Sequence, residues 1–348
     1  MDKNQNRTII TVLGVGGGGN NAVNHMYLQD IEGITFVVSD TDRHQLEELS
    51  VPNCLLLGVN TTLGQSACSD PEAARRAAEE SESEIAALFD DDTKMVIITA
   101  GMGGGTGTGA APVVARIARE KSVLTVGLVT IPFLFEGSLR NLKALSGIEE
   151  MRKYVDALFI INNEHLTEIY SDLNPSNAFM KADKAKTAVV SSLCCLITHI
   201  DPRVCMDFND VNWTLRKGGN AFIVSGFGSG EHRVTKAIEN ALESPLLKDC
   251  DVFSFKKILM ITYYNPNSEF PLLMEEMNEI QKFMENFDHE VDVIWTPARD
   301  STLKDQIKVT ILATGFNVSH SLPMGLTIVL TKLKYENKNI TCGSRFIY

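Results

Sequence analysis

The sequence predicts an α/β protein: a doubly wound, mostly parallel sheet covered by helices, then a long central helix and a second, α+β domain. Three observations indicate this architecture. Short β-rich runs alternate with helical stretches over residues 1–165, which is typical of a parallel sheet. A long helical segment follows at residues 177–199, and a second series of strand-like runs comes after it.

The first sheet is predicted from five short apolar runs rich in β-branched residues. They lie at residues 8–13, 34–39, 95–99, 124–131 and 157–161. Residues 72–89 have helical character, with Ser69 or Asp70 as the N-cap and Pro71 in the first turn. We therefore expect helices to connect the strands.

The central helix is expected over residues 177–199, NAFMKADKAKTAVVSSLCCLITH. Its second half, VVSSLCCLI, is apolar on nearly every face, which predicts burial between two domains. The apolar residues that recur at helical spacing are Phe179, Ala182, Val189, Leu193 and Leu196.

The second domain is predicted from a new set of strands at residues 221–225, 258–263, 291–295, 309–314 and 326–330. Helices at residues 231–243 and 271–287 would pack on them, the latter through an apolar stripe that indicates core. We expect a first domain at residues 1–175, the central helix at 176–200, a second domain at 201–334 and a short tail at 335–348.

Composition narrows the class of function. The 348 residues carry a net charge of -12, which argues against nucleic acid as the main partner because clustered Lys and Arg are needed to neutralise phosphates. No apolar run is long enough to span a bilayer, and the N-terminus shows no signal peptide. Seven cysteines without a C-x-x-C pair favour a reducing cytoplasm.

A first glycine-rich loop, GVGGGGNN at residues 14–21, follows the opening strand and precedes a helix. Such a place suits a phosphate, which can rest on free N–H groups at the positive end of a helix. The loop also satisfies G-x-G-x-x-G, and Asp40 lies about 20 residues further on, as in a dinucleotide-binding fold. A nicotinamide dehydrogenase is therefore an open alternative at this point.

A second glycine-rich loop, GGGTGTG at residues 103–109, argues against that alternative. It follows the strand-like run KMVIIT and opens another helix, so two phosphate-binding loops are expected where a dinucleotide fold needs one. Thr106 and Thr108 add hydroxyl donors. No G-x-x-x-x-G-K-[ST] occurs, which excludes a P-loop.

The same loop is the signature of the tubulin-like GTPases, and the chain from about residue 8 to 332 resembles the FtsZ family of bacterial cell-division proteins within them. Further matching segments occur in the family's order: TVGLVTIPFLFEG, IINNEHL, SGFGSGEHR, ESPLLKD and VTILATGF. The resemblance implies a tubulin-like fold that binds GTP or GDP, with Mg²⁺ held through phosphates and water rather than by direct protein ligands.

The resemblance also implies which residues bind the nucleotide. The two loops would cradle the phosphates, Glu136 and Arg140 would contact ribose and phosphate, and Asn163 would contact ribose and base. Phe179 would stack on guanine, and Asp183 would accept hydrogen bonds from its adjacent N1–H and N2–H donors, a pair that adenine lacks. The full set is Gly17, Gly18, Gly19, Asn20, Asn21, Gly104, Gly105, Thr106, Gly107, Thr108, Glu136, Arg140, Asn163, Phe179 and Asp183.

Catalysis in this family is completed by a neighbouring subunit, so the resemblance implies a head-to-tail homopolymer in which Asp207 and Asp210 act on the neighbour's nucleotide. A heterologous contact of this kind generates open filaments. We expect cytoplasmic filaments at the division site that work with other division proteins, without direct membrane insertion.

Several positions depart from the family pattern. Pro202 and Cys205 replace a glycine and an asparagine of the catalytic loop, which leads us to expect slow turnover. Two glycines are replaced in the loop at residues 64–69, and Asp40 stands where many relatives have Asn. No linker with a membrane-docking peptide follows Tyr335, so we expect either a truncated sequence or a protein without that docking function.

Two functional hypotheses remain. The first is a GTP-hydrolysing, filament-forming cell-division protein. The second is a divergent tubulin-like scaffold or regulator that binds GTP but hydrolyses it poorly, which the altered catalytic loop favours. The dehydrogenase is a distant third, because the second loop and Asp183 argue against it.

Overall fold

The structure is a computed structural model that describes residues 8–89, 92–169, 175–198, 206–244, 247–248, 250–287 and 290–316. In this part of the chain the strands form one sheet of ten. They are β1 (Ile10–Val15), β2 (Ile34–Asp40), β3 (Cys54–Leu56), β4 (Met95–Gly101), β5 (Leu124–Ile131), β6 (Ala157–Asn162), β7 (Gly219–Gly228), β8 (Lys257–Tyr264), β9 (Asp292–Arg299) and β10 (Ile307–Thr314).

The strand order is β3-β2-β1-β4-β5-β6-β7-β10-β8-β9. Every pair from β3 to β7 is parallel, which confirms the doubly wound first sheet. Strand β10 runs antiparallel to both of its neighbours, β7 and β8. The second half of the sheet is therefore of the mixed α+β kind that the sequence predicts.

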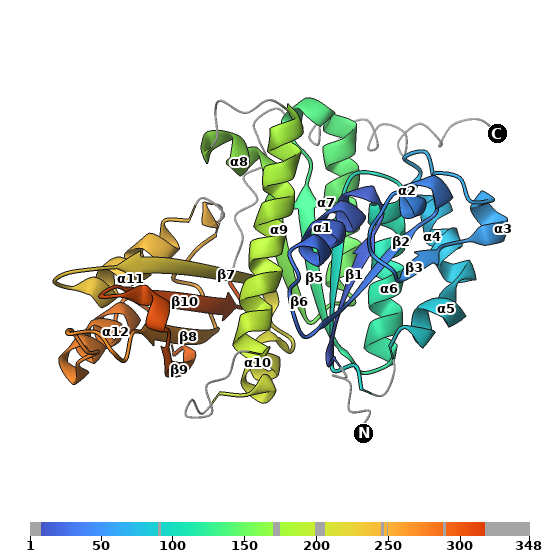
Figure 1. Ribbon diagram of the computed structural model, residues 1–348. Helices are drawn as coiled ribbons and strands as arrows, with labels where there is room; N and C mark the ends of the chain where they lie inside the picture. The colour runs from blue at the N-terminus through green and yellow to red at the C-terminus, as the bar shows by residue number, and fades with distance from the viewer. Residues whose placement is uncertain are drawn as a thin grey trace, which may run out of the picture.

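The helices cover both faces of the sheet, and Figure 1 shows α9 running between the large β1–β6 part and the smaller part with β8, β9 and β10. Among them, α8 and α10 are the short helices that flank α9. The helices are α1 (Gly17–Leu28), α2 (Arg43–Glu47), α3 (Val59–Thr62), α4 (Pro71–Glu80), α5 (Glu82–Ala87), α6 (Thr106–Glu120), α7 (Ser138–Arg152), α8 (Asn163–Ile169), α9 (Pro175–Thr198), α10 (Phe208–Leu215), α11 (Arg233–Leu242) and α12 (Met277–Met284).

Two cores lie on opposite faces of the first sheet because successive side chains of a strand point to opposite faces. Val12 and Ile97 belong to the core under α1 and α9, whereas Leu13 and Ile98 belong to the core under α4 to α7. Both faces being buried explains why these strands are almost entirely apolar.

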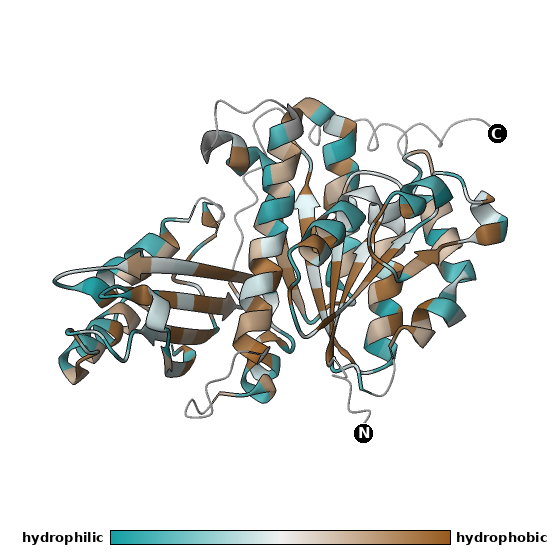
Figure 2. Cartoon of the chain, viewed as in Figure 1, coloured by the Kyte–Doolittle hydropathy of each residue, from teal (hydrophilic) through white to brown (hydrophobic). Residues whose placement is uncertain are grey.

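The C-terminal half of α9 is largely buried, as predicted, with Cys195 as an exposed position. Val190 and Leu193 share one core with the first sheet and with Leu259 and Leu312 of β8 and β10. Figure 2 shows this lower half of α9 in brown against brown strands, while its upper half carries more teal. Helix α9 therefore packs against both parts of the fold.

Most predicted elements of the first part are confirmed, with two differences. The strand β3 was missed, since only three residues pair with β2. The single helix expected over residues 72–89 is broken at Ser81 into α4 and α5. Ser81 leaves helical geometry at φ -93° and ψ 22°, and its hydroxyl accepts a hydrogen bond from the N–H of Gly58.

The second part differs in two details, and two further predictions cannot be compared. Gly219 of β7 pairs with Ala157 of β6, so the two predicted sheets are continuous. The helix expected at 271–287 begins as a 3₁₀ turn at Met274–Glu276 and then continues as α12. The strand expected at 326–330 and the tail at 335–348 lie outside the described residues.

No helix in the described ranges combines the length and apolarity that crossing a bilayer requires.

Candidate functional site

The N-termini of α1 and α6 meet at one edge of the sheet. Helix α1 follows β1 and α6 follows β4, and these two strands pair in parallel, so both helices start at the same carboxyl edge. Their N-cap residues, Gly16 and Gly105, make no side-chain cap. The first-turn N–H groups and the positive helix ends therefore create a site suited to a polyanion.

Close packing of the two loops explains part of the glycine content. Gly16 has a φ of +74°, and a Cβ added there would lie 2.7 Å from the backbone nitrogen of Gly107. Any side chain would push the loops apart and strain the backbone. The sequence needs glycine here for two independent reasons.

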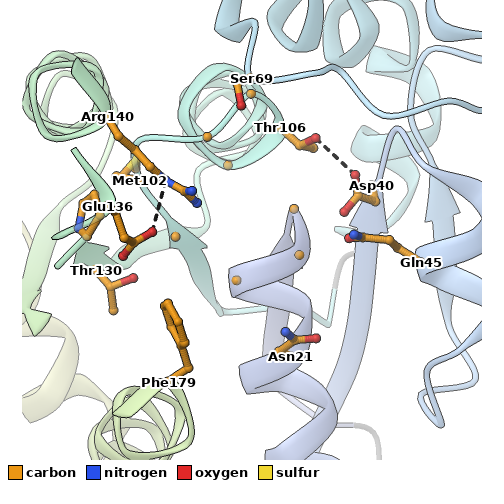
Figure 3. A pocket seen from close by; sticks show the side chains of 18 of the residues that line it. Asn21, Asp40, Gln45, Ser69, Met102, Thr106, Thr130, Glu136, Arg140 and Phe179 are labelled. Atoms are coloured by element: carbon orange, nitrogen blue, oxygen red, sulfur yellow. Dashed lines mark hydrogen bonds and ion pairs between the residues drawn. The ribbon is translucent and has the colours of Figure 1, made fainter. Parts of the chain in front are cut away.

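A cavity of about 310 Å³ opens in front of the two helix ends. Figure 3 shows Asn21 approaching it from α1, Thr106 from α6 and Phe179 from α9. Of the residues that the sequence assigned to nucleotide binding, those lining the cavity are Gly17, Gly18, Asn21, Gly104, Gly105, Thr106, Gly107, Glu136, Arg140, Asn163, Phe179 and Asp183.

Three assigned residues lie behind the cavity wall and act on the loops instead. Gly19 packs against the backbone of Thr99. Asn20 is buried and exchanges hydrogen bonds with the backbone of Ser39, with its Nδ2 also 3.2 Å from Asp40 Oδ2. The hydroxyl of Thr108 accepts a hydrogen bond from the N–H of Gly103 at 2.8 Å.

One end of the cavity offers an aromatic ring and an unpaired side-chain oxygen. Phe179 is 43% exposed and is held by an edge-on contact with the buried ring of Phe133, 5.3 Å between centroids. Asn163 is buried, and its Oδ1 has no hydrogen-bond partner among the described residues. Since a buried polar atom is normally paired, this unpaired oxygen of a cavity-lining residue is a candidate partner for a ligand. With Asp183 nearby, the end suits a flat, hydrogen-bonding ring such as a purine.

The other groups in the cavity are charged. Arg140 and Glu136 form an ion pair of 3.2 Å, which Figure 3 marks. Asp40 is buried beside Thr106, whose hydroxyl donates to Oδ1 at 3.1 Å. Burial raises the pKa of Asp40, while hydrogen bonds from the N–H groups of Asp42 and Thr41 and from Thr106 oppose the rise.

Some lining residues were missed by the sequence analysis. Lys186 and Gln45 stand among them, and a lone Lys or Gln on a helix carries no local signal of a site. The loop noted as a departure, residues 64–69, does border the cavity through Ser66 to Ser69. Within it Cys68 and Ser69 have positive φ values of 46° and 61°, a conformation that favours glycine.

Asp207 and Asp210 do not line this cavity; they form the N-terminal cap of α10, at the opposite end of α9 in Figure 1. The carboxylate of Asp207 accepts from the N–H of Asn209 at 2.6 Å, and that of Asp210 accepts from the N–H of Asp207 at 2.8 Å. Pro202 and Cys205 lie outside the described residues.

Comparison with known proteins points in one direction. Two family models match: "Tubulin/FtsZ family, GTPase domain" over residues 9–171 and "FtsZ family, C-terminal domain" over residues 219–317. The cell division protein FtsZ of Porphyromonas gingivalis is 47% identical over 311 residues, which cover 89% of this chain and 67% of that protein. That of Buchnera aphidicola from Acyrthosiphon pisum is 40% identical over 345 residues, covering 97% of this chain and 88% of that protein.

Solved structures agree with the sequence relatives. An empty FtsZ dimer from M. jannaschii has a TM-score of 0.77 at 36% identity, covering 90% of this chain and 89% of that one. A protofilament of CetZ2 from Haloferax volcanii, at 18% identity and a TM-score of 0.76, shares the fold. Fold, glycine loops and sequence identity agree, and the chain belongs to the FtsZ family of tubulin-like GTPases.

Proposed function

We propose that this protein binds GTP in the cavity in front of α1 and α6, hydrolyses it to GDP and phosphate, and polymerises head to tail in cell division. The observation that carries the proposal is the meeting of two uncapped helix N-termini with a ring-binding end in one cavity. The first feature suits a chain of phosphates and the second suits a base.

Base recognition would come from α9 and the start of α8. The ring of Phe179 offers a face for stacking, and the carboxylate of Asp183 accepts hydrogen bonds from N1–H and N2–H of guanine. The free Oδ1 of Asn163 would accept a further hydrogen bond from the base or the ribose. Adenine has no donor pair for Asp183, so GTP is preferred over ATP.

Phosphate binding would use the N–H groups of both glycine loops, with Arg140 as a nearby cation. Magnesium would bind through phosphate oxygens and water, the mode in which this ion keeps much of its hydration shell. The oxygen atoms of Asp40 and Thr106 at the phosphate end are suited to water molecules of such an ion. The bound ion would neutralise charge on the phosphates as hydrolysis proceeds.

Hydrolysis would be completed in trans by Asp207 and Asp210. Both lie at the end of the molecule opposite to the cavity, so their carboxylates reach a nucleotide only when a second subunit stacks on the first. Part of their hydrogen-bonding capacity is engaged in capping α10. Together with Pro202 and Cys205 in the preceding loop, this supports slow turnover.

The filaments would lie in the cytoplasm at the division site, with further division proteins as partners. The net charge of -12 makes nucleic acid an unsuitable partner.

The test follows light scattering and phosphate release together after GTP and magnesium are added, with ATP as the comparison. Both signals should rise with GTP and neither with ATP. Scattering without phosphate would favour the poorly hydrolysing scaffold instead.

A variant tests the role of Asp207 without removing the helix cap. Asp207→Asn keeps a good N-cap residue but loses the carboxylate, so it should bind fluorescent GTP normally and release phosphate at least about ten-fold more slowly. The matched control is Asp292→Asn, an exposed acid of β9, which should leave both signals unchanged. Normal release by Asp207→Asn would contradict the assignment.

A further inference from the structure

One cation in the cavity has no part in the assignments above. Lys186 lies on α9, three residues after Asp183, and its side chain is only 3% exposed. Its Nζ is 2.9 Å from Oδ1 of Asp183 and 2.6 Å from the carbonyl oxygen of Gly18. A buried ammonium group is costly unless it is paired and hydrogen-bonded, and here both conditions are met.

The two partners of Lys186 belong to opposite ends of the nucleotide site. Asp183 stands at the base end, whereas Gly18 is in the first turn of α1, whose N-terminus faces the phosphate end. One side chain thus connects α9 with the first glycine loop across 168 positions of sequence. The hydroxyl of Thr187, the next residue, lies 3.0 Å from Nδ1 of His25 in α1. This hydrogen bond also connects α9 with α1.

The ion pair with Lys186 fixes the orientation of the Asp183 carboxylate. A carboxylate has about four lone-pair sites, so holding Oδ1 with one ammonium proton leaves Oδ2 and a second site on Oδ1 for a ligand. An unrestrained Asp at the rim of a cavity would lose side-chain freedom on binding. The ion pair removes that freedom before the ligand arrives.

Lys186 also balances charge in the cavity. The charged side chains that line it are three acids and two bases, namely Asp40, Glu136, Asp183, Arg140 and Lys186. Loss of the ammonium group would leave one base and weaken the binding of every polyanionic ligand. Charge balance acts on all nucleotides alike, whereas the orientation of Asp183 acts only on those with donors facing it.

We propose that Lys186 is a positioning residue for guanine selectivity: it holds the carboxylate of Asp183 toward N1–H and N2–H and ties it to the phosphate loop at Gly18. The proposal rests on the function proposed above and adds the residue that sets its selectivity. Nothing in the catalytic step is assigned to Lys186.

The experiment compares GTP with inosine triphosphate, which lacks the 2-amino group, by competition against fluorescent GTP. Wild type should prefer GTP by roughly 10- to 150-fold, the range for a hydrogen bond to a charged group. Lys186→Met, of similar length but without charge, should bind both nucleotides more weakly and reduce the preference to about three-fold or less. The control Lys184→Met, an exposed lysine of the same helix, should leave affinity and preference unchanged.

A double-mutant cycle separates positioning from a structural role. If Lys186 acts through Asp183, Lys186→Met in an Asp183→Ala background should change the preference no further. An unchanged preference in Lys186→Met, or independent effects of the two changes, would overturn the proposal.

If Lys186→Met shows no cooperative unfolding, Lys186→Gln replaces it, since a neutral polar group is less costly to bury beside Gly18. The same loss of preference is expected, and its absence would overturn the proposal. Wild type that binds no GTP at all would instead refute the proposed function, and the inference with it.

Discussion

Replacing Gly104 by alanine should separate nucleotide binding from the stability of the glycine loop. A Cβ built on Gly104 meets no atom within 4 Å, and its φ lies outside the left-handed region. Alanine fits such a position and should stabilise the folded protein by about 0.4–1 kcal/mol, because it reduces the conformational entropy of the unfolded chain. The variant should therefore be as stable as wild type or slightly more stable.

Binding should respond in the opposite direction. Gly104 lines the cavity, so the new methyl group would occupy space next to the loop N–H groups. Loss of one hydrogen bond to a charged phosphate costs about 1.5–3 kcal/mol, which corresponds to a roughly 10- to 150-fold higher Kd for GTP. The assay is titration of fluorescent GTP, paired with urea unfolding of the nucleotide-free protein.

Gly107→Ala is the matched control because it lies three residues away in the same loop. A Cβ there would lie 2.3 Å from the carbonyl oxygen of Gly101, so backbone must move. Overpacking of this kind costs about 1–3 kcal/mol, and this variant should lose stability as well as affinity. Wild-type affinity in Gly104→Ala would refute the placement of phosphates on this loop, and equal instability in both variants would refute the packing argument.

Three further outcomes are expected. Asp40→Asn should raise the free energy of unfolding at pH 7. Because burial raises the pKa of Asp40 in the folded state, ionisation of its carboxyl destabilises the folded protein as the pH rises above the ordinary pKa of 3.8. The stability that the variant gains over wild type should therefore shrink as the pH falls toward 3.8. Arg233→Met should cost about 3–5 kcal/mol in urea unfolding, because its buried guanidinium binds Glu276 at 2.6 and 3.0 Å. Arg75→Met, at an exposed and solvent-screened ion pair, should cost far less, and similar losses in the two variants would contradict this reasoning. Ser69→Gly should raise the melting temperature, since serine at a φ of 61° costs about 1–2 kcal/mol, and an unchanged melting temperature would count against strain in this loop.

The sequence alone determined the alternation of strands and helices and the position of the two glycine-rich loops. Strands buried on both faces must be apolar, so the alternation of β-rich runs with helical stretches can be recognised from the local sequence. Glycine was equally informative, because the close approach of Gly16 and Gly107 tolerates no other residue. The assignment of Phe179 and Asp183 to base binding came from resemblance to a family, since an isolated Phe or Asp has no local signature.

Tertiary structure decided how these pieces are connected. The helix expected over residues 72–89 is interrupted at Ser81, whose hydroxyl accepts a hydrogen bond from the distant N–H of Gly58. Asn20 supports the loop at Ser39 instead of lining the cavity. Lys186 reaches Gly18 only because α9 packs beside α1. Local patterns record the preferences of neighbouring residues, whereas an ion pair or hydrogen bond between distant segments exists only once their helices have packed. For that reason the two glycine-rich loops could be predicted from the sequence, whereas the contacts of Lys186 with Asp183 and Gly18 became visible only in the tertiary structure.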